Sequence, residues 1–224
     1  MKPRPRTLKD IKVYQDIHSV LSRFVPDRFI AVLYEHMRDN KEDGFNHVYL
    51  RNSLMVVRKL IANTRGLNLN DLKLLYCTVA LIESGRPLSK DKPYELSPGV
   101  SWLLLELHAK GRFSKDELSF ISKNAKPLKP QTLRPSHHVV LQLLIHNTKQ
   151  LTDVVNYQYQ KLYDIFMEGR ATQKTDKDPH QQFLDYYGAQ GALWEAISDS
   201  AKLVYQSEIS KFKRELESAV TRKL

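Results

Sequence analysis

Two polar residues at the ends of apolar helical patterns are the first candidates for chemistry. His47 stands at the start of FNHVYLRNSLMVVRKL, where apolar residues follow at helical spacing. Glu83 follows the apolar run YCTVALI and comes shortly before Gly85. Imidazole and carboxylate groups act as general bases and as metal ligands. Glu83 is therefore either a solvated residue at the end of a core helix or part of a catalytic centre.

Common catalytic and cofactor motifs are absent from the sequence. It contains no phosphate-binding GxxxxGK[ST] loop, no GxGxxG fingerprint, no HExxH and no GxSxG. The single cysteine, Cys77, lies inside the apolar run and is expected to be buried. One cysteine excludes a disulfide framework and a cysteine-rich zinc site, and it suits the reducing cytosol. A cytoplasmic location is therefore expected.

The sequence predicts an all-α fold of about seven to nine helices, and these helices must position the candidate residues. Gly66, Gly85, Gly111 and Gly169 fall where helical patterns stop, and no proline interrupts such a pattern. Asn70 is expected to cap one helix, and Ser114 with Glu117 is expected to form a capping box. The predicted helices cover residues 8–24, 26–39, 45–65, 71–84, 98–111, 114–123, 136–168 and 181–224, the last with breaks expected near Gly188 and Gly191.

A single domain over residues 1–224 is predicted. It comprises a helical pair at 1–44, a core at 45–210 and a basic end of the last helix at 211–224. With 42% hydrophobic and 27% charged residues the composition is that of a globular protein. No apolar stretch approaches the roughly 20 residues of a membrane span, so no membrane partner is expected.

Four stretches of the core resemble elements of the HD-domain phosphohydrolases, which are all-α proteins. The first is the helix opened by His47, FNHVYLRNSLMVVRKL, since a metal-binding histidine opens the corresponding helix of the family. LIESGRP is similar to the element that carries the family's His-Asp pair, with Ile82 and Glu83 in those two positions. HHVVLQLLIHNTKQL resembles a later helix and matches His146 or, as the alternative, His138. EAISDSAKLVYQSEI resembles the last element and places Asp199.

The resemblance implies a divalent metal site (Mn²⁺, Fe²⁺, Co²⁺ or Zn²⁺) that activates water against a phosphate ester. Arg51 or Arg86 would hold the substrate phosphate. Ile82 cannot ligate a metal, so the site is degenerate. The chain would be a weak metal-dependent phosphohydrolase acting on a nucleotide or phosphoester, or a pseudoenzyme that binds such a ligand, with or without the metal. The metal ligands implied are His47, Glu83, His146 and Asp199, with Glu83 also as the catalytic carboxylate.

A second interpretation rests on the formal charge of +10, which favours anionic partners. The chain would then be a non-enzymatic, regulatory helical protein that binds nucleic acid or an acidic protein. The sequence carries no signal for an oligomeric state. The candidate contacts to nucleic acid or another anion are Lys126, Lys129 and Arg134 in a proline-rich connection, and Lys213 and Arg214 near the C-terminus.

Overall fold

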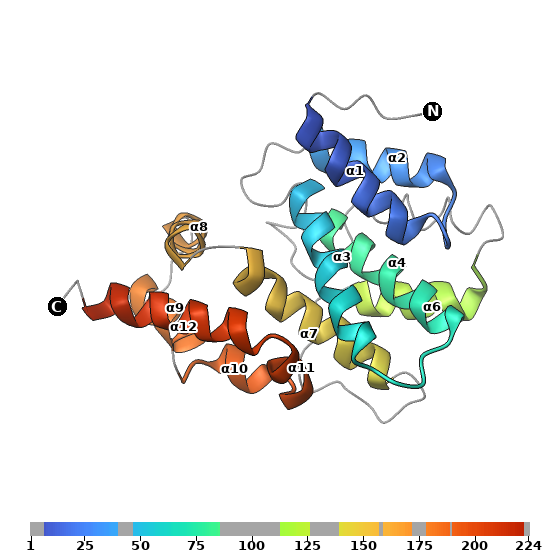
Figure 1. Cartoon of the computed structure of the whole chain (residues 1–224). Helices are drawn as coiled ribbons and strands as arrows, with labels where there is room; N and C mark the ends of the chain where they lie inside the picture. The colour runs from blue at the N-terminus through green and yellow to red at the C-terminus, as the bar shows by residue number, and fades with distance from the viewer. Residues whose placement is uncertain are drawn as a thin grey trace. The chain divides into compact units, whose positions relative to one another are not determined.

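The computed structural model describes residues 7–39, 47–85, 113–125, 139–156, 159–171, 178–188 and 190–221 (Figure 1). All regular secondary structure in these ranges is helical, which confirms the all-α prediction. Their eleven helices are α1 (Leu8–Leu21), α2 (Asp27–Asp39), α3 (His47–Ala62), α4 (Leu69–Gly85), α6 (Lys115–Ala125), α7 (Val139–Asn156), α8 (Tyr159–Ala171), α9 (Pro179–Tyr187), α10 (Ala192–Ala196), α11 (Asp199–Val204) and α12 (Gln206–Thr221).

The described ranges hold more helices than the seven to nine predicted, because two long predicted helices are divided. The stretch 136–168 contains α7 and part of α8, and the stretch 181–224 contains α10 to α12 and most of α9. The expected break at Gly188 is confirmed, since α9 ends at Tyr187 and the Gly188 N–H bonds the Leu184 carbonyl at 2.7 Å. At Gly191 a Cβ would collide with the Tyr186 carbonyl, so this turn requires glycine.

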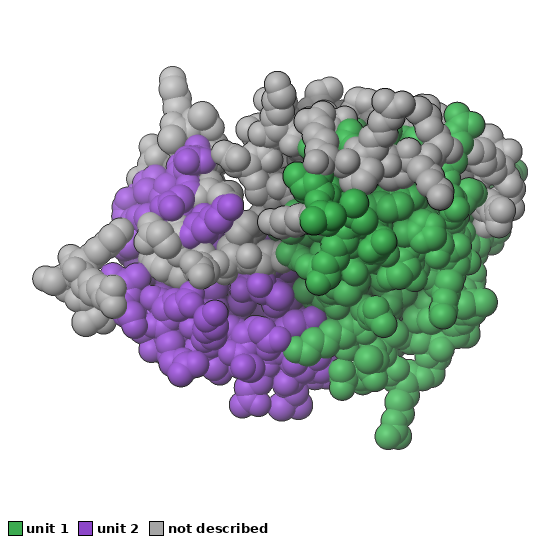
Figure 2. All heavy atoms as spheres, turned by 45° about the horizontal axis from the view of Figure 1, so that its top comes forward, with its two compact units in different colours: residues 1–148 green, residues 149–224 purple. Residues whose placement is uncertain are grey.

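The chain divides into two compact units, residues 1–148 (unit 1) and residues 149–224 (unit 2), coloured in Figure 2. In unit 1, α3 packs against α1 and α4, and α4 also packs against α6. The apolar stripes of these helices supply fully buried side chains such as Leu21, Leu54 and Leu75. Burial of one such side chain contributes about 1.5–3 kcal/mol, so this shared core fixes the helices that carry the candidate residues. The prediction of a single domain stays a prediction.

Unit 2 is organised around aromatic side chains. Phe183 is fully buried and contacts Tyr163 edge-on, with ring centroids 5.1 Å apart, and Tyr187 at 4.8 Å. The Trp194 indole N–H donates to the Gly188 carbonyl at 2.5 Å, which ties α10 to the end of α9. Rings at these separations add about 0.5–1.5 kcal/mol per pair beyond the area they bury.

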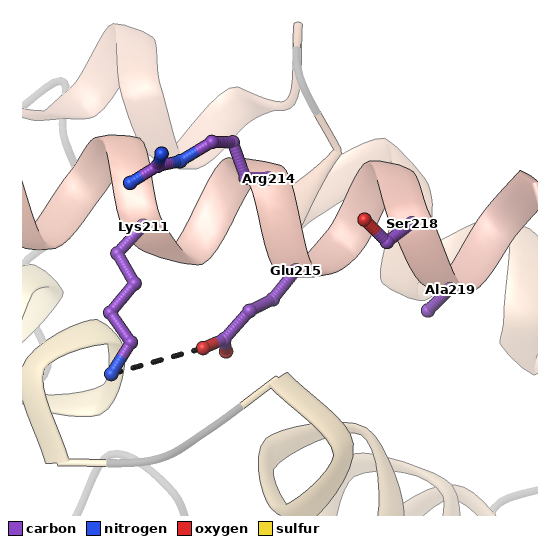
Figure 3. A pocket seen from close by; sticks show the side chains of 5 residues that line it. All are labelled: Lys211, Arg214, Glu215, Ser218 and Ala219. Atoms are coloured by element: carbon purple, nitrogen blue, oxygen red, sulfur yellow. Dashed lines mark ion pairs between the residues drawn. The ribbon is translucent and has the colours of Figure 1, made fainter.

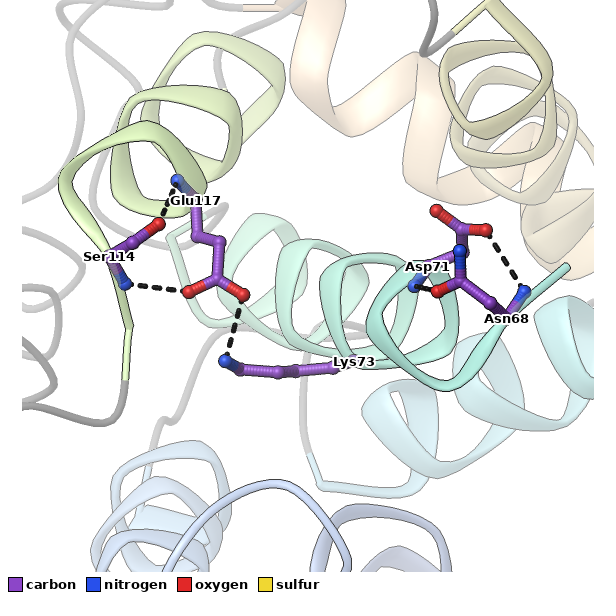
Figure 4. A network of polar contacts seen from close by, with 5 residues as sticks. All are labelled: Asn68, Asp71, Lys73, Ser114 and Glu117. Atoms are coloured by element: carbon purple, nitrogen blue, oxygen red, sulfur yellow. Dashed lines mark hydrogen bonds and ion pairs between the residues drawn. The ribbon is translucent and has the colours of Figure 1, made fainter.

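Two helix starts in unit 1 are held by reciprocal side-chain hydrogen bonds (Figure 4). Ser114 Oγ accepts from the Glu117 N–H at 3.2 Å and Glu117 Oε2 accepts from the Ser114 N–H at 2.6 Å, which confirms the predicted capping box. The predicted cap at Asn70 is wrong, because α4 begins at Leu69. Asn68 caps it instead, exchanging 3.0 Å bonds with Asp71 three residues later.

Glu117 also joins the two helices. Its Oε1 accepts a hydrogen bond from Lys73 Nζ on α4 at 2.9 Å, and the Lys73 ammonium lies 4.2 Å from the Phe113 ring centroid. Both partners of the ion pair are mostly buried, with 19% and 16% of their side chains exposed. One carboxylate therefore both caps α6 and anchors it to α4.

Candidate functional site

His47 opens α3, as the sequence indicated, but its partner is Asp10 on α1. His47 Nε2 lies 3.0 Å from Asp10 Oδ1, and both side chains are largely buried. The Tyr34 ring meets the imidazole edge-on at 5.2 Å, and the Tyr34 hydroxyl donates to the Asp10 backbone carbonyl at 3.0 Å. Burial raises the pKa of Tyr34 to about 12, and the Asp10 charge adds to the shift. The surroundings of His47 thus fix the start of α3 against α1 and α2.

Asp10 stays ionised in this cluster. Burial alone would raise the pKa of Asp10, but hydrogen bonds from Thr7 and from His47 outweigh it and lower the pKa below its usual value. Thr7 also caps α1, since its side chain accepts from the Asp10 N–H at 3.1 Å. The backbone N–H of Asp10 therefore takes part in the N-cap of α1, and its carboxylate holds the first residue of α3, His47.

The other predicted metal ligands lie on three different helices. Glu83 on α4 is only 1% exposed, and His146 on α7 is half-buried. Asp199 starts α11 in unit 2, where its side chain is 97% exposed and pairs with Lys202 at 3.1 Å. In the ranges that the structure describes, no group of three or more His, Cys, Asp or Glu side chains could hold a metal ion. The metal site and the catalytic role of Glu83 therefore stay predictions.

Of the two arginines predicted to bind phosphate, Arg51 is already engaged. Its Nε donates to Asp16 Oδ2 on α1 at 2.7 Å, and its Nη1 donates to Asn52 Oδ1 at 3.1 Å. Arg86 lies outside the described residues. Two of the five N–H donors of the Arg51 guanidinium are therefore used within the protein.

Cys77 is buried, as predicted, with 3% of the residue exposed. Burial raises the pKa of the Cys77 thiol to about 12, so the nucleophilic thiolate is scarce at neutral pH. Cys77 is a core residue of α4 and not a nucleophile.

The basic residues of α12 are mostly satisfied within unit 2. Lys213 Nζ lies 4.6 Å from the Trp194 ring centroid, and Arg214 Nε donates to the Ser210 carbonyl at 3.3 Å. Lys211 reaches toward Glu215 at 3.9 Å, while Arg214 extends away from that pair (Figure 3). The groove here has a volume of about 480 Å³ and a mixed lining of Lys211, Arg214, Glu215, Ser218 and Ala219. It is not a concentrated patch of positive charge.

The two units differ sharply in charge. Unit 1 contains 24 Lys and Arg against 14 Asp and Glu, a formal charge of +10. Unit 2 contains 11 of each, a formal charge of zero. Within unit 1 the ranges 1–6, 40–46, 86–112 and 126–138, which lie outside the described residues, contribute 12 basic and 5 acidic residues, or +7. These ranges include the candidate contacts Lys126, Lys129 and Arg134.

No protein-family model, curated protein or solved structure matches the chain. The resemblance to the HD-domain phosphohydrolases thus rests on the quoted stretches alone. Nor does any helix in the described part of the chain have the length and apolar character needed to cross a membrane.

Sequence reasoning missed Asp10 and Asp16, the acidic partners of His47 and Arg51. Each pair joins residues far apart in the chain, 37 and 35 positions, so no local pattern announces the contact. Only the amphipathic character of α1 could have suggested that its Asp residues face another helix.

Proposed function

We propose that the protein is a non-enzymatic helical protein that binds nucleic acid through phosphate contacts made by unit 1. The observation that carries this proposal is the confinement of the whole formal charge of +10 to residues 1–148. Such an uneven distribution of charge favours the binding of a polyanion such as nucleic acid. Each phosphate that a Lys or Arg neutralises releases condensed counterions, and this release raises the affinity.

The proposal assigns the phosphate contacts to Lys126, Lys129 and Arg134 and removes Lys213 and Arg214 from the interface. The first three belong to the basic unit, in a stretch with no acidic residue between 118 and 148. The last two belong to a neutral unit, where Lys213 covers Trp194 and Arg214 bonds its own helix. A location in the cytoplasm, expected from the single cysteine, is part of the same proposal.

The proposal predicts strongly salt-dependent binding to nucleic acid. With about three phosphate contacts, the affinity for a fluorescent 20-base-pair duplex should fall roughly 40-fold between 50 and 200 mM salt, from a slope of about −0.9 per contact. Fluorescence anisotropy of the full chain with DNA and RNA duplexes measures this slope. Absence of binding at 50 mM salt would refute the proposal. Equal competition by polyglutamate of matched charge would instead indicate an acidic protein partner.

A second candidate function is the degenerate HD-like site, and the burial of Glu83 favours it. A carboxylate that is 1% exposed is rare, and α4 packs directly on α3, the helix that His47 opens. On this proposal the chain binds a nucleotide or phosphoester, with or without weak hydrolysis. Purified protein should then carry Mn, Fe, Co or Zn or gain thermal stability from Mn²⁺ or Co²⁺, and the Glu83→Ala variant should lose that effect. A wild-type melting temperature insensitive to these ions in metal-free protein would exclude the metal-dependent form.

A further inference from the structure

The exposed charged side chains of unit 1 are mostly basic. Among the described side chains of this unit, eight Lys or Arg are exposed but only two Asp or Glu. The described side chains of unit 2 show the reverse, with three exposed bases and seven exposed acids. The exposed bases of unit 1 are Lys12, Arg23, Arg28, Arg58, Lys59, Arg65, Lys115 and Lys123. The described surface of unit 1 therefore complements a polyanion.

Both acidic residues of helix α1 are engaged by α3. Asp10 Oδ1 lies 3.0 Å from His47 Nε2, and Asp16 Oδ2 accepts from Arg51 Nε at 2.7 Å. The side chains of Asp10 and Asp16 are 15% and 31% exposed. Because each carboxylate has a partner on α3, neither opposes an anion that approaches α1 from the solvent.

The solvent face of α1 is a single stripe without a carboxylate. Its exposed residues are Leu8, Ile11, Lys12, Gln15 and Ser19, followed by the C-cap residue Ser22, which is also in the α-helical conformation. At 3.6 residues per turn these positions lie within an arc of about 100° and extend over about 21 Å of helix. Lys12 and Gln15 form no hydrogen bond or ion pair with the described residues, so both are available to a ligand.

The side chains of this stripe are of the types that contact base edges. Lysine bonds guanine O6 and N7, glutamine bonds adenine N6 and N7, serine bonds several bases, and apolar groups contact the thymine methyl. With one cation among six residues, the stripe suits bases better than a row of phosphates. An α-helix fits the major groove of B-DNA, whereas the major groove of A-form RNA is too narrow for side chains to read.

We propose that α1 lies in the major groove of double-stranded DNA and contacts base edges through Lys12, Gln15 and Ser19. The binding of nucleic acid rests on the proposed function. The inference adds the kind of nucleic acid, the groove and the residues that select a sequence. The phosphate contacts of the proposed function supply affinity, and α1 supplies the preference for particular base pairs.

The test is selection of duplexes by the full chain from a library of random DNA sequences, followed by sequencing. Wild type should enrich a short motif, with each well-made contact favouring the correct base roughly 5- to 150-fold. Gln15→Ala should lose the preference at one base pair and keep the others, and Lys12→Gln should do so at a different base pair. Because both residues are exposed, the two variants should melt within about 2 °C of wild type. Lys115→Gln, which removes an exposed lysine from α6, is the matched control and should leave the motif unchanged.

A second measurement compares the selected duplex made of DNA with the same sequence made of RNA, by fluorescence anisotropy. The DNA duplex should bind at least about tenfold more tightly. Three results would each overturn the inference and leave the proposed function standing: binding without an enriched motif, a motif unchanged in both α1 variants, or equal affinity for DNA and RNA. Absence of binding to any duplex at about 50 mM salt would instead refute the proposed function, and the inference with it.

Discussion

Replacing Lys126, Lys129 and Arg134 together by glutamine should weaken duplex binding by up to about 500-fold at 0.1 M salt. Each lost phosphate contact makes the slope of log affinity against log salt concentration shallower by about 0.9. At 0.1 M salt this change corresponds to a loss of nearly one decade in affinity per contact. The triple variant should therefore also have a salt slope shallower by up to about 2.7. Anisotropy titrations at four salt concentrations give both quantities.

The matched control is the triple glutamine variant of Lys211, Lys213 and Arg214. It removes the same number of positive charges from the chain, but from the neutral unit, and should change the affinity less than threefold. Equal losses in the two triple variants would show that total charge governs binding, and the assignment of the interface to unit 1 would then be wrong.

The Glu117→Ala variant should lose about 2–3 kcal/mol in the free energy of unfolding at pH 7. It removes the hydrogen bond to the Ser114 N–H and leaves Lys73, 19% exposed, without its carboxylate. The Glu117→Gln variant keeps the cap and should lose less. Asp116→Ala is the control, because that residue is exposed in the first turn of α6, where a carboxylate contributes about 0.3–1 kcal/mol through the helix dipole. Chemical denaturation monitored by circular dichroism measures the free energy of unfolding of all three variants. Equal decreases for Glu117→Ala and Asp116→Ala would contradict the role of Glu117 in joining α6 to α4.

The contribution of Glu117 should also depend on pH. Burial raises the pKa of Glu117, but the bonds from Lys73 and from Ser114 outweigh burial and hold the pKa below its ordinary value of 4.5. The unfolded chain therefore binds a proton more readily than the folded one. The stabilisation is complete well above pH 4.5 and is lost as the pH falls through the lower, folded pKa. The gap in stability between wild type and Glu117→Gln should thus narrow below pH 4.5, and a gap that widens there would contradict the sign of the shift.

Most of the fold follows from local signals in the sequence. Apolar positions at helical spacing placed α1 to α4, and the Ser114–Glu117 spacing located the start of α6 because both halves of a capping box lie within four residues. Asn68 and Asn70 are equally good caps by residue type. The structure selects Asn68 because Asp71 stands three residues after it and returns the hydrogen bond.

The candidate site could not be read from the sequence in the same way. His47 and Glu83 were placed correctly on their helices, but nothing local shows that His47 faces Asp10 or that Arg51 faces Asp16. The charge asymmetry was present in the sequence, yet it becomes visible only when the chain is divided after Thr148.

Lysine footprinting of the full chain with and without duplex tests most directly whether unit 1 binds nucleic acid. Acylation at 50 mM salt, read by mass spectrometry, reports on each lysine separately. Protection of Lys126 and Lys129 by the duplex, with Lys211 and Lys213 acylated equally in both samples, is the predicted result. Protection of Lys211 and Lys213 with Lys126 and Lys129 unchanged would contradict the proposal.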